Sequence, residues 1–580
     1  MKNFSRYRRT NRLSMALVCS TFFFLLLFVS SAFGETAKPA LTDHEKLQWG
    51  ERMYREGLLP SGEPVQAFVK GDLPVPGTSF TCVSCHLRSG LGSIEGGVVT
   101  PPTNGDNLFK PLLATYKHLT QKFFPLPPIR PAYTDATLAE AIRSGVVPGG
   151  HKLNDVMPRY LIDDADMSIL EFYLKSLSAK VSPGVSDTNI SFATVIAEDV
   201  RPEDRDAMLS VLDNFVAIKN TQVSAFKTQR GARSRLMAEN MLASREFAMR
   251  TFSLSRWVLK GPPETWRAQL EEYNRKEPVF ALLGGITNGD WRPIHQFSEE
   301  NHIPSLFPIT DFPVVSAADW YTLYFSKGYY QEGEAAARYL NANDGAVAGR
   351  PIIQVVRASR EGQALSAGFL ETWHDLGHQA PLTVTLKAGE TISNDFLKKL
   401  SDREKPAAIL LWGGSDMLPA LDALAGDRHR PGIVFVSSSY LGMDIWALHE
   451  QIREFTYITY PFTFAQNGAS PSTNGTIVQS DQQKTIYLKD LAVKTRPQKI
   501  ASLSLSLTQI LAMALMEMRG NYYRDNFLDV IGMVPDQNFT LYERLSFGPG
   551  QRYASKGCYI VQLLPGPVPE LVKKSAWVIH

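Results

Sequence analysis

The stretch Cys82-Val83-Ser84-Cys85-His86 constrains this chain more than any other. Two cysteines separated by two residues and followed at once by a histidine have the spacing that attaches a c-type haem. Each thiol can add to one vinyl group of the porphyrin, and the adjacent imidazole then serves as the proximal iron ligand. Because the motif occurs once, the sequence predicts one covalent haem c held by Cys82, Cys85 and His86.

Two other kinds of site use a close pair of cysteines: a redox-active dithiol and one half of a zinc site. A zinc site needs about four ligands, and the remaining cysteines, Cys19 and Cys558, do not form a second pair. A redox dithiol leaves the adjoining histidine without a role, and no thioredoxin-like pattern of strand and helix surrounds the motif. The sequence therefore favours haem attachment over both alternatives.

The amino terminus has the pattern of a secretory signal. Five basic residues precede and border the apolar stretch Met15–Phe33, and Ala32-Phe33-Gly34 offers small residues at the positions that a signal peptidase reads. We expect residues 1–34 to be removed before Glu35 and the mature protein to be periplasmic, where haem is attached. The alternative is an uncleaved anchor, because the apolar stretch is long enough to span a bilayer; no other membrane attachment is expected.

Charge and the lack of catalytic motifs exclude other classes of function. The expected leader carries five basic and no acidic residues, so its removal lowers the formal net charge of +2 by five. Such a surface offers no electrostatic attraction for nucleic acid. No hydrolytic triad or phosphate-binding loop stands out. His374 and His378 have i, i+4 spacing, but a solvated helix face explains them better than a metal site. We expect no enzymatic activity.

Two amphipathic helices are predicted around the haem motif. Thr42-Asp43-His44-Glu45 has the pattern of a capping box that begins the first helix. Asp163 is placed to cap the second helix, which ends shortly before residue 178. Gly50 lets the two helices approach closely, because glycine has no side chain at the crossing point.

Residues 40–178 resemble a Met/His-ligated cytochrome c domain, which is an all-α fold. The resemblance rests on these segments: Gly50-x-x-x-Tyr54, Cys82-x-x-Cys85-His86, Gly90-Leu91-Gly92, Glu95-Gly96, Pro101-Pro102 and Met157-Pro158-Arg159-Tyr160. In that family the methionine of a Met-Pro-x-Tyr segment is the second iron ligand, which implies Met157 here. The alternatives for this role are His118, His151 and Met167.

The resemblance also implies how the haem domain works. A thioether ligand favours the ferrous state and suits electron transfer, so we expect a redox partner protein, either a dehydrogenase or a respiratory cytochrome. A backbone carbonyl of Pro101 or Pro102 is expected to accept the Nδ1 proton of His86 and so orient the ring.

The character of the chain changes after Ser178. Residues 179–189 form a polar linker, and residues 190–580 alternate apolar strands with helical patterns, as in a doubly wound α/β fold with parallel sheets. The expected strands are Phe192–Ala197, Phe252–Leu259, Val279–Leu283, Ile352–Val356, Ala407–Leu411, Gly432–Val436 and Tyr457–Tyr460. The expected helices include Pro202–Lys219, Glu264–Lys276, Trp291–Asn301, Gln331–Ala342 and Gln363–Leu376. The length of this region predicts two lobes.

Several passages of residues 190–580 resemble the type I periplasmic solute-binding proteins, the family of the branched-chain amino-acid receptors. The passages are Val279–Asn288, Ile303–Thr310, Tyr329-Tyr330-Gln331-Glu332-Gly333, Tyr460-Pro461-Phe462 and Leu545–Gln551. Their order and spacing carry the resemblance. It implies a two-lobed fold, a return crossover after Tyr460 and a small-molecule ligand at the carboxyl ends of the strands.

The candidate ligand-binding residues follow the expected strands: Thr287, Asn288, Thr310, Asp311, Arg360, Trp412 and Ser438. An α-amino acid does not fit this set well. Glu361-Gly362 stands where the family has Tyr-Gly, and no acidic residue occupies the loop around Ser438. Whether Trp291 and Trp412 line the ligand site or belong to the core stays open at this point.

Two functions from different classes follow. The first is a periplasmic monohaem cytochrome that transfers electrons and whose solute-binding-like domain senses or docks a small molecule. The alternative is a solute receptor of an ABC-type transport system with an accessory haem domain. Fold alone does not decide between them. A haem enzyme that acts on a bound substrate is a weaker third option, because no general base is recognisable.

Overall fold

The computed structural model describes residues 41–69, 73–95, 98–112, 129–228, 250–316, 318–343, 345, 349–464, 485–487, 493–548, 550–566 and 568–579. The expected signal peptide, its cleavage site and the alternative membrane anchor lie outside these residues. The chain divides into two compact units. The first unit comprises the described residues within Met1–Cys82, Leu108–Ala114 and Pro128–Ser176, and the second comprises those within Val83–Asn107 and Leu177–His580.

The first unit is mainly helical but not all-α. It contains the helices α2 (Asp43–Glu56), α5 (Asp135–Ser144) and α6 (Asp164–Ser176) and the short strands β1 (Gln66–Val69), β2 (Leu73–Pro76) and β5 (Arg159–Leu161). The strands form an antiparallel sheet in the order β2-β1-β5. Pro74 and Pro76 keep β2 out of a helix, and proline suits an edge strand because it cannot donate to the ladder. The expectation of an all-α unit is corrected accordingly.

The two helices predicted at the ends of this unit are confirmed. Helix α2 begins at a capping box, in which the Thr42 hydroxyl accepts from the Glu45 amide at 3.2 Å. The Asp163 carboxylate accepts from the amide of Asp166 at the start of α6 at 2.8 Å. A Cβ atom on Gly50 would lie 2.4 Å from the Cβ of Tyr173 in α6. The close approach of the two helices therefore requires glycine at this position.

The residues that follow Cys82 form short elements. They are α3 (Cys82–His86), β3 (Ser93–Glu95), β4 (Val98–Thr100) and α4 (Gly105–Leu108). β3 and β4 pair in an antiparallel hairpin. Gly90 and Gly92 have positive φ angles of 69° and 81°, a backbone conformation that glycine adopts without steric cost. These turns bring the chain back past His86, whose carbonyl oxygen accepts from the Gly92 amide at 3.2 Å.

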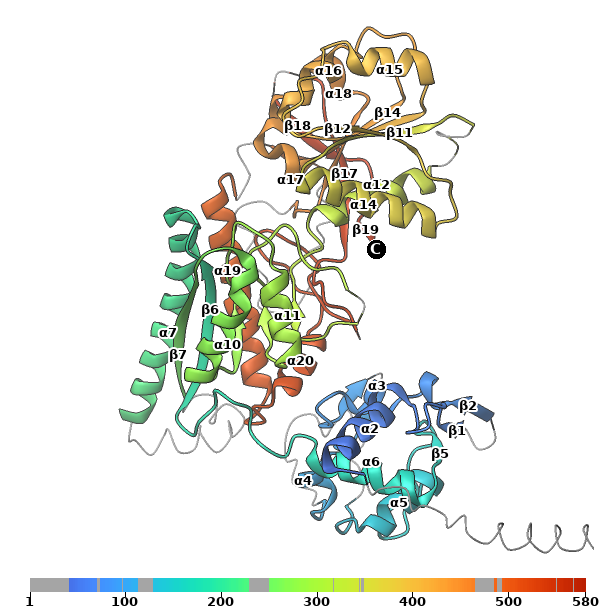
Figure 1. Cartoon of the computed structure of the whole chain (residues 1–580), viewed down its shortest axis with the longest axis vertical. Helices are drawn as coiled ribbons and strands as arrows, with labels where there is room; N and C mark the ends of the chain where they lie inside the picture. The colour runs from blue at the N-terminus through green and yellow to red at the C-terminus, as the bar shows by residue number, and fades with distance from the viewer. Residues whose placement is uncertain are drawn as a thin grey trace, which may run out of the picture. The chain divides into compact units, whose positions relative to one another are not determined.

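The larger part of the second unit is built from two α/β lobes (Figure 1). Lobe 1 has a parallel five-stranded sheet in the order β10-β9-β8-β6-β7. Its strands are β6 (Asn189–Ala197), β7 (Thr251–Leu259), β8 (Ala281–Leu283), β9 (Ser305–Leu306) and β10 (Thr322–Leu323). Its helices are α7 (Pro202–Thr228), α10 (Trp266–Lys276), α11 (Arg292–Glu300), α19 (Arg496–Glu517) and α20 (Arg524–Gly532).

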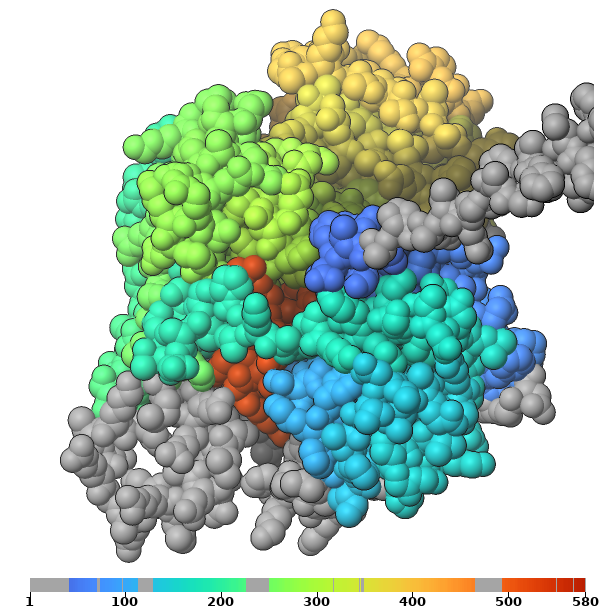
Figure 2. Space-filling view, turned by 60° about the horizontal axis from the view of Figure 1, so that its bottom comes forward, coloured from blue at the N-terminus to red at the C-terminus, as the bar shows by residue number. Residues whose placement is uncertain are grey.

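Helices cover both faces of this sheet. The crossover from β6 through α7 to β7 moves towards one edge of the sheet. The crossovers from β7 through α10 to β8 and from β8 through α11 to β9 move towards the opposite edge. Because such crossovers are right-handed, α7 lies on the opposite face from α10 and α11. α19 packs against α7, and α10 packs against α11. The green side chains of the α10 and α11 region form one surface of lobe 1 in the space-filling view (Figure 2).

Lobe 2 has a mixed sheet in the order β12-β11-β13-β14-β15-β17-β18-β16, with β19 paired to β17. The first five strands of this order are parallel, and β17 is antiparallel to β15. The strands are β11 (Ile352–Arg357), β12 (Leu382–Leu386), β13 (Ala408–Trp412), β14 (Ile433–Ser437), β15 (Thr456–Tyr460), β16 (Thr485–Tyr487), β17 (Gly557–Leu563), β18 (Glu570–Lys573) and β19 (Val578–Ile579). The helices are α12 (Tyr329–Ala342), α14 (Arg360–Asp375), α15 (Phe396–Glu404), α16 (Leu418–Asp422), α17 (Ser438–Leu441) and α18 (Glu450–Arg453).

The chain passes from one lobe to the other three times within the described elements. It leaves lobe 1 after β10, returns to lobe 1 between β16 and α19, and enters lobe 2 again before β17. The crossover expected at Tyr460-Pro461-Phe462 is not where the described elements change lobe, because β16, which follows Tyr460, still pairs in the lobe 2 sheet. The first and third passages run side by side, since the Ala554 amide donates to the Tyr324 carbonyl at 3.0 Å and the Ser555 amide to the Phe325 carbonyl at 2.7 Å. We call these two strands of chain, 324–328 and 553–556, the hinge segments.

Helix α19 is long and apolar enough to cross a membrane by length and composition, and no other helix of the described residues is. Its apolar side chains, among them Leu507, Leu511 and Ala514, are buried in the core of lobe 1. Core packing therefore explains its composition.

Candidate functional site

His86 has the geometry of an oriented metal ligand. The ring lies at the end of α3 with 8% of the residue exposed, and its Nδ1 atom is 2.8 Å from the backbone oxygen of Pro101. Because a carbonyl oxygen only accepts, Nδ1 carries the proton and Nε2 presents its lone pair. Burial lowers the pKa of His86 to about 4, so the imidazole is neutral at pH 7, as a metal ligand must be. The partner expected from the sequence, Pro101 or Pro102, is Pro101.

The two cysteines of the motif suit covalent attachment. Cys82 and Cys85 are one helical turn apart on α3. Cys82 is half-buried, Cys85 is exposed, and neither is in a disulfide. The hydroxyl of Ser93 donates to the backbone oxygen of Cys85 at 2.9 Å and ties the helix to the β3–β4 hairpin. The thiols and the neutral imidazole fit a c-type haem, which would be held by these three side chains. Cys558 is fully buried in lobe 2.

The candidates for the second iron ligand differ in their surroundings. Met157 is half-buried, and its amide donates to the Asn154 carbonyl at 3.1 Å. Met167 is buried in α6 with 2% exposed, and His151 is exposed. His118 lies outside the described residues. Met157 as the distal ligand stays a prediction.

In lobe 1 the predicted ligand-binding residues follow two neighbouring strands. The Asn288 side chain donates to the backbone oxygen of Asp199 at 2.6 Å and so joins the loops after β8 and β6. Thr287 is 7% exposed. The Thr310 hydroxyl accepts from the Phe312 amide at 3.0 Å in the loop after β9. The sheet order reverses between β6 and β8, so these loops lie at the switch point where α/β sheets bind ligands.

In lobe 2 the order reverses between β11 and β13, and Arg360 directly follows β11. Arg360 is exposed and begins α14, which the Ser359 hydroxyl caps by accepting from the Gly362 amide at 3.2 Å. Ser438 begins α17 and is buried with 3% exposed. Its hydroxyl has no hydrogen-bond partner among the described residues.

Trp412 is corrected from a ligand-site residue to a core residue. It is fully buried in β13, and its indole nitrogen donates to the Gln354 side chain at 2.9 Å. Trp291 is fully buried as well, in the core of lobe 1. A ligand cannot touch either indole, because the surrounding strands and helices bury both completely.

Three aromatic rings bring loops of the two lobes together. The Phe312 and Tyr329 ring centroids are 5.2 Å apart, and those of Tyr329 and Tyr440 are 6.1 Å apart. The Arg360 guanidinium lies 4.2 Å from the Phe312 centroid. Arg360 of lobe 2 therefore contacts the ring of Phe312, which directly follows Asp311 of lobe 1 in the sequence. We call Phe312, Tyr329 and Tyr440 the aromatic cluster.

Sequence reasoning did not select the aromatic cluster as ligand-binding residues. Tyr329 stands within a passage that resembles the solute-binding family, where its place in the chain is the only signal. Tyr440 lies in the loop around Ser438, which was singled out only for its lack of an acidic residue. Phe312 has no signal, because it lies in a loop without periodicity. All three rings are half-buried, so each has both a packing surface and an accessible edge.

Most charges near the aromatic cluster are already compensated. The Lys499 ammonium is 2.8 Å from the Asp311 carboxylate. Burial opposes ionisation of both groups, yet their mutual attraction lowers the pKa of Asp311 and raises that of Lys499. Arg357 pairs with Asp416. Burial also raises the pKa of Glu332, against the hydrogen bond that it accepts from the Thr459 hydroxyl at 2.6 Å.

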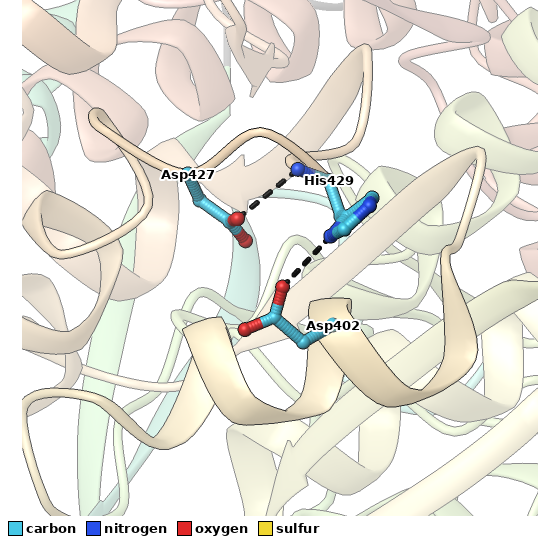
Figure 3. Close-up of side chains that lie close together, drawn as sticks. All are labelled: Asp402, Asp427 and His429. Atoms are coloured by element: carbon cyan, nitrogen blue, oxygen red, sulfur yellow. Dashed lines mark hydrogen bonds and ion pairs between the residues drawn. The ribbon is translucent and has the colours of Figure 1, made fainter.

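A separate group in lobe 2 holds three potential metal ligands, Asp402, Asp427 and His429, whose ligand atoms lie within 4.8 Å of one another. His429 Nδ1 is 2.9 Å from the Asp402 carboxylate, and the His429 amide donates to Asp427 at 3.0 Å (Figure 3). Asp402 and His429 are exposed. These hydrogen bonds connect α15 to the turn before β14, which is a sufficient structural role.

No protein-family model matches the chain, and no curated protein matches it. Several solved structures are similar to about two thirds of the chain. An ABC transporter substrate-binding protein from Sphaerobacter thermophilus is 12% identical with a TM-score of 0.45, covering 68% of this chain and 99% of the other. A branched-chain amino acid ABC transporter protein from Thermus thermophilus with bound valine is 12% identical with a TM-score of 0.43, covering 68% and 98%. A solute-binding protein from R. palustris in complex with benzoate is 11% identical with a TM-score of 0.42, covering 68% and 98%.

Proposed function

We propose that this protein is a periplasmic solute-binding protein that carries one covalent haem c. The observation that supports ligand binding is the meeting of loops from both lobes at the aromatic cluster. These loops follow strands at or beside the switch points of the two sheets, which is where open α/β sheets bind ligands. A type I periplasmic-binding-protein fold, with two α/β lobes joined by three passages of the chain, agrees with this role.

The haem assignment rests on His86. Its ring is neutral, and the hydrogen bond to Pro101 fixes the tautomer that leaves Nε2 available to iron. When bound, the haem supplies a one-electron redox centre. His86 orients the centre, and Cys82 and Cys85 fix it to the chain. We propose that Met157 is the distal ligand and that the chain exchanges electrons with a redox partner, a dehydrogenase or a respiratory cytochrome. No catalytic step is proposed for the chain itself.

A ligand screen on the purified haem protein tests the solute-binding function. A compound that binds the folded form raises the apparent melting temperature by mass action. We expect at least one small organic compound to raise it in a concentration-dependent manner, and Tyr440→Ala to reduce that shift. The matched control is Tyr523→Ala, since Tyr523 lies outside the aromatic cluster. A library of transported solutes that gives no shift would contradict the proposal.

Substitution of Met157 tests the electron-transfer function. Met157→Ala should abolish the far-red sulfur–iron charge-transfer band and lower the midpoint potential, because a thioether stabilises the ferrous state. Met167→Ala is the matched control and should retain the band. An unchanged spectrum in Met157→Ala would assign the ligand to another residue.

The transport role is the second candidate. A receptor of an ABC-type system would bind its solute with the same lobes and use the haem as an accessory group. The two roles differ in what the haem does, so they separate by experiment. If transport of the ligand is unaffected by Cys82→Ser/Cys85→Ser in cells, then the haem is accessory.

A further inference from the structure

The residues that directly follow His86 are fastened to helix α20 of lobe 1. The Asp529 carboxylate accepts two backbone amides, one from Ser89 at 2.8 Å and one from Arg88 at 3.3 Å. Asp529 is 5% exposed and Ser89 is fully buried. A buried carboxylate that accepts two amides holds its partner segment firmly, since an unpaired charge at this depth would cost several kcal/mol.

The side chain of Arg88 reaches further into lobe 1. Its guanidinium lies 4.4 Å from the Trp320 ring centroid and 4.0 Å from the Asp525 carboxylate. The Arg552 guanidinium also lies over Trp320, at 3.9 Å, and donates to the Trp320 backbone oxygen at 3.0 Å. Arg88, Trp320 and Arg552 therefore form one packed set, in which two guanidiniums contact one indole ring.

This packed set adjoins the hinge segments. Trp320 comes four residues before the first hinge segment, and Arg552 comes one residue before the second. The Tyr324 amide donates to the Arg552 carbonyl at 2.9 Å, so the two ends are joined at this point. Two-lobed binding proteins close on a ligand by changing the conformation of such joining segments. The segment after His86 thus contacts the lobe-1 end of the hinge.

We propose that Arg88 and Asp529 couple the redox state of the haem to the hinge of the two lobes. The inference rests on the proposed haem attachment. Oxidation adds one positive charge at the iron ligated by His86, two residues before Arg88. Charges interact strongly where water is excluded. The added positive charge therefore destabilises the position of the Arg88 guanidinium over the Trp320 ring. The contact with the hinge segments is weaker in that state.

Coupling of this kind is reciprocal. If reduction stabilises one arrangement of the hinge segments, then a ligand that favours the same arrangement raises the midpoint potential by the same free energy. Arg88 and Asp529 are positioning residues in this account, because they act through the backbone of the haem segment and touch neither iron nor ligand.

Amide hydrogen exchange of the haem protein tests the proposal without a ligand. The protein is compared in its oxidised form and after one-electron reduction by ascorbate or dithionite, and exchange is followed in residues 320–325 and 550–556. We expect roughly fivefold or faster exchange in the oxidised form. Helix α15, which lies in lobe 2, provides the internal reference and should exchange equally in both forms.

Two variants separate coupling from a purely structural role. Asp529→Ala removes both amide contacts, and Arg88→Gln removes the guanidinium from Trp320 while leaving Asp529 with its two amides. Both should bring the exchange ratio of the two forms close to one. The matched control, Asp206→Asn, changes an exposed aspartate of lobe 1 and should keep the wild-type ratio.

The outcomes are distinct. Absence of covalent haem would contradict the proposed function itself. Full haem content with equal exchange in both redox states would overturn the coupling and leave the proposed function standing. A wild-type exchange ratio that persists in Arg88→Gln would also overturn it, and that variant covers the case in which Asp529→Ala does not fold.

Discussion

His86 and Asp529 show which residues of the haem region a sequence can reveal. The two cysteines, the histidine and its carbonyl partner lie within 20 residues of one another, and their spacing reflects covalent chemistry. Asp529 is 440 residues away from Ser89. It stands in a helix without any motif, so its contact with the haem segment follows only from the folded structure.

The buried carboxyl of Asp529 should make stability depend on pH. Burial raises its pKa to about 6, against the lowering effect of the Ser89 and Arg88 amides. A carboxyl with a higher pKa in the folded state binds more protons there than in the unfolded state, so stability is greatest below about pH 4 and falls as the pH rises towards 6. The change is on the order of 3 kcal/mol at most.

Differential scanning calorimetry of Asp529→Asn at pH 4.5 and pH 7 measures this effect. The amide of the variant does not ionise. The difference in melting temperature, variant minus wild type, should therefore be more positive at pH 7 than at pH 4.5. Asp206→Asn, at an exposed site, should show the same difference at both pH values. A difference for Asp529→Asn that is independent of pH would contradict the raised pKa.

At the scale of elements, the seven strands and five helices named from apolar patterns are all present. Their bounds agree within a few residues, except that the helix expected to end at Lys219 continues to Thr228. Buried strands such as β8 and β13 carry continuous apolar runs, which is the pattern of strands covered on both faces. The two-residue strands β9 and β10 were not predicted, because a run of two residues has no periodicity. The strands of the first unit were missed for a similar reason, since β2 alternates leucine and valine with proline.

The crossing of α2 and α6 gives a prediction for the first unit. Gly50→Leu places a side chain where Tyr173 already lies, since even a Cβ atom would be 2.4 Å from the Cβ of that residue. Overpacking of this kind costs about 1–3 kcal/mol or more. Hydrogen exchange of α2 amides in the full chain should therefore be at least about fivefold faster in the variant.

Gln48→Ala is the control for this prediction, because Gln48 is exposed on the same helix. It should leave the protection of α2 unchanged. Equal protection in Gly50→Leu would show that α2 and α6 do not depend on their close approach.

At the scale of the whole molecule, the change of pattern after Ser178 was visible in the sequence and agrees with the start of lobe 1 at β6. The return crossover expected after Tyr460 was placed too early, because β16 still belongs to the lobe 2 sheet. The sequence predicted only in part which residues lie together at the ligand site. Strand ends identify which loops meet, but not which side chains in those loops are exposed. Trp412 and Phe312 illustrate the difference, since the first is buried at its strand end and the second contacts Arg360 from a loop.

The central claim is that an exported solute-binding chain carries one covalent haem, and the intact mass of the mature protein tests it most directly. The protein is produced with its own leader in a host that attaches haem c, and its mass is measured after acid–acetone extraction, which removes any haem that is not covalent. We predict the mass of residues 35–580 plus one haem, and the mass of the bare chain for Cys82→Ser/Cys85→Ser. A wild-type mass without haem, or with two haems, would contradict the account.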